Sequence, residues 1–243
     1  MALYKAEGYV IGAKNWGETN RMMVFFTKER GIVKAMAFGC RRPRSPLAAG
    51  MQMFSLLDMQ LAEGKRVDTV RQCAIRHSHQ TLREDLSAIA YAAFVAELLR
   101  AFLPEGEPEP NAYERLGKIF SSFEWRNPRV TAIAAAFQLM EFTGLQLHYK
   151  CCVHCACAVH EDAFFSIEEG GVLCSNCREN GAISFPKELQ TLILALRDFD
   201  WDTHTSIHIA ASLLVQAEQI LLAYLEHLLG RPMKSLQFIR QLT

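Results

Sequence analysis

The sequence lacks any segment typical of a membrane anchor or an export signal. No run of about 18 apolar residues occurs, since the richest apolar stretches contain Glu97, Glu141 or Glu218. The opening residues, MALYKAEGYVIG, have no apolar core behind a basic cap, so we expect no secretory signal peptide. These absences predict a cytoplasmic protein with no membrane partner.

Common catalytic motifs are also missing. The chain contains no GxxxxGK[ST] phosphate loop, no GxSxG nucleophile and no HExxH zinc helix. His77 and His79 lie close together without an obvious acidic partner. His204 and His208 have the i, i+4 spacing of a helical metal pair, although a structural or surface role is the simpler interpretation. We therefore predict that the chain is not an enzyme and has no catalytic residues.

The chain has no net charge, but its charges are unevenly distributed. Basic and acidic residues number 26 each. Residues 1–80 hold 13 Lys and Arg against 6 Asp and Glu, whereas residues 81–243 hold 13 against 20. Chance could produce such a division, but it is also typical of proteins with one polyanion-binding end.

The first 78 residues are predicted to form strands. Short runs rich in β-forming residues alternate with Gly-containing turns such as Lys28–Gly31. Five strands within this length fit a small closed barrel, and the OB-fold is a five-stranded barrel that binds oligonucleotides. The expected strands cover residues 6–12, 21–27, 32–39, 53–61 and 67–75.

The rest of the chain has mostly helical periodicity. One helix is expected over 81–103, followed by an acidic linker over 105–110. Asn111 is the expected N-cap of a helix that reaches about residue 125, and Asn127-Pro128 is expected to start a helix that ends at Gly144. A last long helix is expected over 206–229, ended by Gly230.

Cysteines form the strongest local signal. Six of the eight lie between residues 151 and 177, and two CxxC pairs, Cys152/Cys155 and Cys174/Cys177, have 18 residues between them. This spacing predicts a structural four-cysteine zinc site with one Zn²⁺ per chain. Alternative ligands are available in Cys151, Cys157, His154 and His160, and dithiol redox chemistry is the main competing interpretation.

A basic loop is the second candidate site. Arginine side chains pair bidentately with phosphate oxygens, and exposed aromatic rings stack on bases. A solvated surface turn is the simpler explanation of the loop, as core packing is for each aromatic. The candidate DNA-binding residues are Arg41, Arg42 and Arg44 in the loop, Lys34 and Arg21 in the flanking strands, and Lys65 and Arg66 in a later turn. Tyr9, Trp16, Phe26 and Phe38 are the candidate stacking residues.

Four stretches in order resemble the RecO family over almost the whole chain. They are EGYV through GETNR with FTKERG, then AFGCRRPRS, then GGVLCSNC, and finally HLLGRPMKSL. The chain departs from many relatives at Ala156, where they have glycine, and in its extra thiols. The resemblance implies an α+β protein with an N-terminal OB-fold barrel and an α-helical domain containing an inserted zinc module. We place the boundaries at 1–80 for the barrel, 81–149 and 185–243 for the helical domain, and 150–184 for the zinc module.

The same resemblance implies a function in bacterial DNA repair. RecO-like proteins are recombination mediators that bind single- and double-stranded DNA and anneal complementary strands. They act with RecR, recognise the C-terminal tail of the single-stranded-DNA-binding protein, and help RecA load onto DNA. A nucleoid-associated location would follow. The alternative is a zinc-ribbon OB-fold protein of transcription or RNA metabolism.

Overall fold

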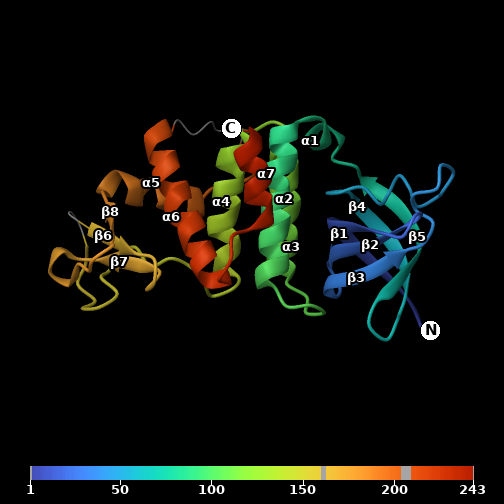
Figure 1. The fold of residues 1–243 in the computed structure, drawn as a ribbon, viewed down its shortest axis with the longest axis horizontal. Coiled ribbons are helices and arrows are strands. Elements are labelled where there is room, and N and C mark those ends of the chain that lie inside the picture. The colour runs from blue at the N-terminus through green and yellow to red at the C-terminus, as the bar shows by residue number, and fades with distance from the viewer. Residues whose placement is uncertain (1, 160–162, 204–208, 243) are drawn as a thin grey trace.

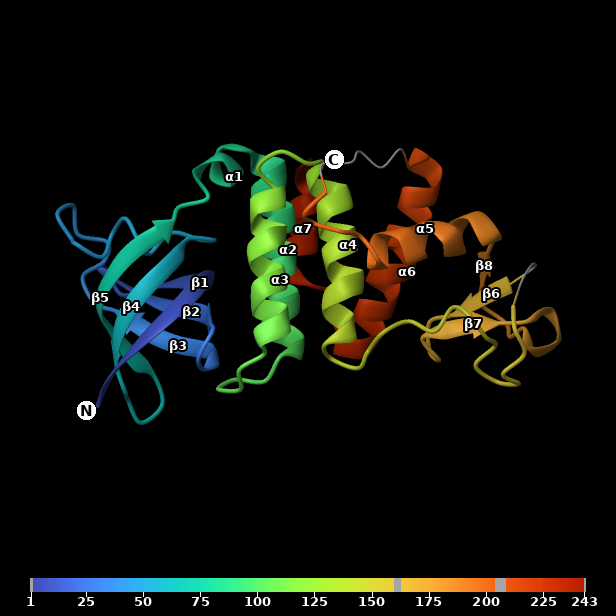
Figure 2. The same cartoon turned by 180° about the vertical axis from the view of Figure 1, so that it is seen from behind.

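The protein is elongated, with a barrel at one end, helices in the middle and a small sheet at the other end (Figure 1; Figure 2 shows the reverse side). This computed structural model describes residues 2–159, 163–203 and 209–242. The expected positions of His160, His204, His208 and the start of the last long helix therefore lie outside the described residues. The predicted fold class, an α+β barrel followed by helices with an inserted cysteine segment, is confirmed.

The N-terminal residues form a closed barrel with strand order β1-β2-β3-β5-β4. Neighbouring strands are antiparallel except β3 and β5, which pair in parallel. All five expected strands are present, with shifted ends. They are β1 (Leu3–Trp16), β2 (Asn20–Thr27), β3 (Gly31–Ala37), β4 (Leu56–Ala62) and β5 (Asp68–His77).

Side chains alternate between the inside and the outside of the barrel. Val10, Phe25 and Val33 are directly opposite one another on β1, β2 and β3 and belong to the barrel's own core. The neighbouring row on the outer face belongs instead to the larger core shared with the helices. Because side chains alternate with a period of two, each of these strands contributes one set of side chains to the barrel core and the other set to the core shared with the helices.

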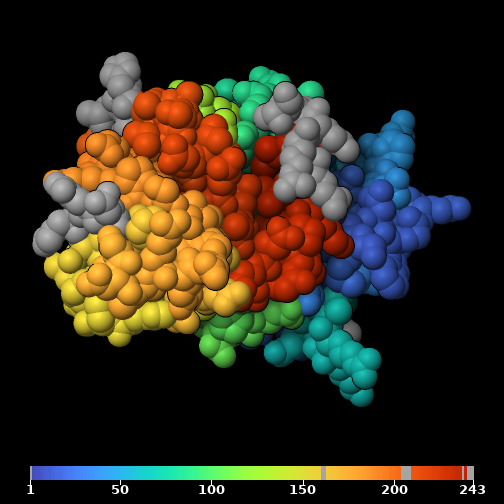
Figure 3. All heavy atoms as spheres, turned by 60° about the vertical axis from the view of Figure 1, so that its left-hand side comes forward, coloured from blue at the N-terminus to red at the C-terminus, as the bar shows by residue number. Residues whose placement is uncertain are grey.

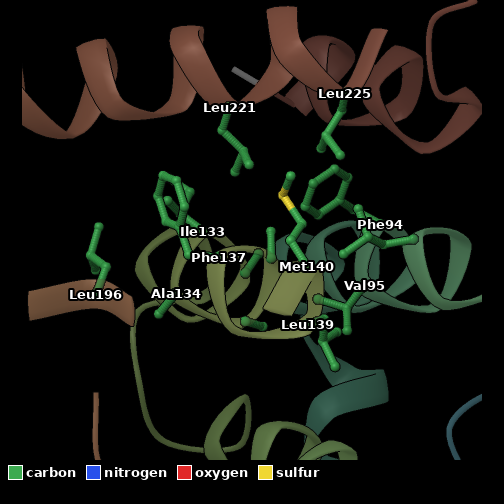
Figure 4. Packing of buried hydrophobic residues seen from close by; sticks show 14 of the residues in the cluster. Phe94, Val95, Ile133, Ala134, Phe137, Leu139, Met140, Leu196, Leu221 and Leu225 are labelled. Carbon is green, nitrogen blue, oxygen red and sulfur yellow. The ribbon is translucent and has the colours of Figure 1, made fainter. Parts of the chain in front are cut away.

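The helical part packs around α4, which is buried along most of its length. Ile133, Phe137 and Met140 of α4 lie among side chains of α2 and α6, including Phe94 and Leu221 (Figure 4). The helices are α1 (Gln80–Glu84), α2 (Leu86–Phe102), α3 (Pro110–Ser122), α4 (Pro128–Glu141), α5 (Lys187–Arg197), α6 (Ala211–Leu229) and α7 (Lys234–Leu242).

Two of the expected helix boundaries are confirmed, and others are wrong. The helices expected to reach 125 and 144 end at Ser122 and Glu141. The Asn127 side chain accepts hydrogen bonds from two backbone N–H groups of α4, and Gly230 ends α6 in the left-handed conformation. The expected helix over 81–103 is divided, because Asp85 is extended and caps α2 with its side chain. Asn111 is inside α3, since Pro110 already takes the first helical position, where no N–H is needed.

The acidic linker between α2 and α3 lies against the barrel. The Gly106 N–H donates to the carbonyl of Ile32 at 3.1 Å, and Glu105 forms a parallel bridge with the same residue. The carboxylate of Glu105 also forms an ion pair with Lys34 of β3. The linker therefore fixes the helical part to one edge of the barrel.

The cysteine-rich segment contains a three-stranded sheet of order β7-β6-β8. Its strands are β6 (Ala163–Ser166), β7 (Gly171–Leu173) and β8 (Ile183–Phe185), with a short 3₁₀ turn, η1 (Ser175–Cys177), after β7. Phe165, Val172 and Phe185 join the core of the helical part. The small sheet is thereby attached to the helices beside α5 and α6 (Figure 1).

Candidate nucleic-acid interface and metal centre

The outer face of β1, β2 and β3 is covered at one end by the helical part. Tyr9, Phe26 and Ile32 form one row across these strands and are buried. Tyr9 and Phe26 pack against Tyr113 of α3, with ring centroids 5.4 and 5.8 Å apart, respectively. Two of the four candidate stacking residues are therefore core residues and cannot meet a base.

The other end of the same face is open. Trp16 and Phe38 are 56% and 58% exposed, respectively. Trp16 pairs with Asn20 across the β1–β2 hairpin, and Phe38 continues the outward alternation of Lys34 and Met36. The two remaining stacking candidates thus lie at the same end of the sheet.

The basic loop is attached to this open end by backbone hydrogen bonds. The Arg41 N–H donates to the carbonyl of Thr19 at 3.0 Å, and the Gly39 N–H donates to Asn20 Oδ1 at 2.8 Å. The side chains of Arg41, Arg42 and Arg44 are exposed. The loop therefore presents three guanidinium groups beside the turn that follows Trp16.

Arg21 of β2 is bound to neighbouring segments of the barrel. Its guanidinium donates to the Met51 carbonyl at 3.0 Å and to Asn15 Oδ1 at 3.2 Å, and the residue is half-buried. Lys34 is farther along β3 and forms an ion pair with Glu105. Of the predicted basic residues in the first strands, Arg21 and Lys34 thus have partners within the chain.

Lys65 and Arg66 are on the turn between β4 and β5. Both are exposed, and this turn projects from the barrel separately from the basic loop (Figure 3). The parallel pairing of Asp68 with Ala35 places the start of β5, just after this turn, beside the middle of β3.

Two basic residues on this face were missed from the sequence. Lys14 is directly opposite Met22, which is opposite Met36, so all three lie on the open outer face. Lys14 could have been predicted to face outward, because it is two residues before Trp16 on the same strand. Arg100 reaches the face from α2, since a Cβ added at Gly12 would lie 3.0 Å from its Nη1. No sequence signal could have placed a residue of α2 there.

The cysteine segment brings four thiols together. The sulfur atoms of Cys152, Cys155, Cys157 and Cys174 all lie within 4.8 Å of one another. Cys155 Sγ is 3.4 Å from Cys157 Sγ and 3.7 Å from Cys174 Sγ. Three of the four predicted ligands are in this group, and a set of thiols at such distances fits a tetrahedral metal site.

Cys177 is adjacent to this group. Its N–H donates to the Cys174 carbonyl at 3.0 Å. Cys177 is the predicted ligand that lies outside the group of four close thiols, and Cys157 lies in that group instead. Cys151 is exposed and is not among the four close thiols, and His154 pairs with Glu179 at 3.3 Å.

Backbone geometry prepares Cys152 for metal binding. Burial would raise the pKa of its thiol, but hydrogen bonds from the backbone of Cys155 and Cys174 lower it to about 6. The first loop is closed by a hydrogen bond from the Ala156 N–H to the Cys152 carbonyl, at 2.9 Å. Ala156 has a φ of 59°, a left-handed conformation that favours glycine.

His79 does have an acidic partner, contrary to the expectation. Its Nδ1 lies 2.9 Å from Oε1 of Glu124, which follows α3. Its position 45 residues along the chain from His79 explains why no local pattern reveals it.

The chain thus combines a five-stranded barrel, open at one end of its outer face, with a helical domain that contains an inserted cysteine cluster. Two family models match the chain. One, described as Recombination protein O N terminal, matches residues 1–79, and the other, Recombination protein O C terminal, matches residues 83–237. The chain belongs to the RecO family, whose curated members have roles in DNA repair.

Curated relatives named DNA repair protein RecO are similar along most of their length. The protein of Alkaliphilus metalliredigens is 35% identical over 199 residues, covering 81% of this chain and 80% of the relative. That of Symbiobacterium thermophilum is 33% identical and covers 98% and 97%. That of Bacillus subtilis is 29% identical and covers 99% and 95%. Within the described residues no helix is long and apolar enough to cross a bilayer.

Proposed function

We propose that the protein is a recombination mediator that binds DNA at the open end of the barrel. The observation that carries this proposal is the placement of Trp16 and Phe38 beside three exposed arginines, on a fold whose family acts in DNA repair. Guanidinium groups bind phosphates of single or double strands, whereas the exposed rings stack only on unpaired bases.

This mode of binding suits strand annealing. Contacts to phosphates and to the flat faces of bases do not use the base edges. A bound single strand therefore keeps its Watson–Crick edges available to a complementary strand. Positive charge near both strands would also reduce their mutual repulsion.

In this proposal the metal centre has a structural role and stabilises the fold. Cys152, Cys155, Cys174 and Cys177 hold one Zn²⁺, and Cys157 is the fifth, spare thiol. A site with four protein ligands has no open position, which is typical of structural zinc. Cys174→Ser should release the ion and lower the melting temperature, whereas Cys73→Ser, outside the cluster, should leave metal content unchanged. Full zinc retention by Cys174→Ser would contradict this ligand set.

The remaining partners are proposed from family membership alone. They are RecR, the C-terminal tail of the single-stranded-DNA-binding protein and, functionally, RecA. The measurement is RecA assembly on DNA coated by that protein, with and without this chain and RecR. Assembly that is not accelerated would contradict the mediator role without affecting the DNA-binding proposal.

The first test is fluorescence anisotropy of a labelled oligo-dT as a function of salt. Arg41→Ala with Arg42→Ala should reduce the slope of log K against log salt by about 1.4, at about 0.7 per lost phosphate contact. Trp16→Ala should weaken binding by about 1–3 kcal/mol with little change in slope. Lys187→Ala with Arg231→Ala removes two exposed charges from the helical part and is the matched control.

Three results would count against this assignment. An unchanged slope in the double-arginine variant would show that the basic loop is not the DNA site. Stronger competition by structured RNA than by DNA would favour the alternative, an RNA-metabolism protein. Equal loss of binding in the control pair would point to non-specific charge attraction.

A further inference from the structure

The junction between the barrel and the helical part contains three metal-binding side chains that the DNA-binding site does not use. His77 is the last residue of β5, His79 immediately precedes α1, and Glu124 follows α3. One donor atom from each lies within 4.8 Å of those of the other two. Two segments that are distant in sequence thus meet at one point.

The three residues are held in place by the surrounding structure. The His79 ring is 2% exposed and lies 4.1 Å from the His77 ring, centroid to centroid. The His79 N–H donates to His77 Nδ1 at 3.2 Å, and the Glu124 N–H donates to the Ser121 carbonyl at 3.2 Å. His79 is in the left-handed region with a φ of 46°. Such a conformation in a buried non-glycine residue requires support and often occurs at functional sites.

The site is also accessible. A cleft of about 570 Å³ between the barrel and α3 is lined by His77, His79 and Trp125, among other residues. His77 is exposed and Glu124 is 25% exposed. A cation and its water ligands can therefore enter without local unfolding.

We propose that His77, His79 and Glu124 bind a second divalent transition-metal ion of the zinc class, which joins the barrel to the helical part. Two imidazole nitrogens and one carboxylate oxygen are a ligand set that such ions prefer, with the remaining positions filled by water. The ion would replace the direct contact between His79 and Glu124. Because its ligands come from both sides of the junction, it would restrict movement of the barrel relative to α3.

The test is Co²⁺ binding to the full chain, followed by absorption spectroscopy and metal analysis. Cobalt at the cysteine centre produces sulfur-to-metal charge-transfer absorption, whereas cobalt at a nitrogen and oxygen site does not. Wild type should bind one equivalent with that absorption and one without it. His77→Ala and Glu124→Gln, on opposite sides of the junction, should each weaken the second equivalent by at least about tenfold.

The controls separate this site from others. His227→Ala removes an exposed histidine of α6 and should bind two equivalents, as wild type does. The thiolate absorption should be the same in all four proteins, which would show that the variants are folded. A single equivalent in wild type, or two equivalents of undiminished affinity in both site variants, would overturn the proposal.

Discussion

Replacing Gly31 by alanine should release the acidic linker from the barrel. Gly31 begins β3 with a φ of 59°, and a Cβ there would lie 1.9 Å from the carbonyl oxygen and 2.6 Å from the carbonyl carbon of Glu107. The obstacle is backbone, so no side-chain rotation can relieve it. The linker must move, and its hydrogen bond from Gly106 to Ile32 would be lost with it.

The expected loss of folding stability in Gly31→Ala has two contributions. A left-handed conformation costs an alanine about 1–2 kcal/mol, and forced displacement of packed groups costs about 1–3 kcal/mol more. Gly106→Ala is the matched control, because Gly106 has a φ of 81° but no atom within 4 Å of its added Cβ. It should lose only the first contribution. The effect of glycine replacement on the unfolded chain is the same in both and cancels.

The assay is urea denaturation of the two variants and wild type, with digestion by a glutamate-specific protease as a second measurement. Gly31→Ala should lose about 1–3 kcal/mol more than Gly106→Ala and should be cut faster within residues 105–109. Equal losses of stability, with equal digestion rates, would refute the argument that the linker is held against Gly31.

Four further variants test three local features. Ala156→Gly should stabilise the protein by about 1 kcal/mol by relieving a left-handed alanine, measured in denaturant. Asn127→Ala should cost about 1 kcal/mol through loss of the α4 cap, and Asn127→Ser should restore most of it. Burial would raise the pKa of Glu97, but hydrogen bonds from the backbone of Ser235 and Lys234 keep it below its ordinary value. The stability advantage of wild type over Glu97→Gln should therefore shrink as the pH falls from about 6 to about 3.

The strands could be predicted because each carries β-forming residues between turn residues. The ends of the strands could not be predicted in this way. β1 continues to Trp16 because the chain reverses only at Gly17, which has a φ of 61°. β4 begins at Leu56 because Phe54 takes a left-handed conformation with its ring buried against Phe120. Tertiary packing determines where this strand begins, so the alternation of residues in the strand could not predict it.

The candidate DNA-binding site could be predicted only in part for a related reason. Tyr9, Phe26, Trp16 and Phe38 are equally plausible aromatics in outward or alternating positions of strands. Which of them meet solvent depends on where α3 lies, and that is a property of the whole fold. The cysteine spacing was more informative, because two CxxC loops bring their own ligands close together. It still could not predict that Cys157, rather than Cys177, lies in the group of four close thiols.

The helical part has two effects on the outer face of the barrel. It buries the row containing Phe26, and through Glu105 it neutralises Lys34 at the next exposed basic position. Only the end with Trp16, Phe38 and the arginine loop keeps both aromatic surface and unpaired positive charge. A polyanion approaching this face is therefore repelled by the acidic linker and attracted to the opposite end. A chain without net charge can attract a polyanion in this way, because its acidic and basic groups act at different ends of one sheet.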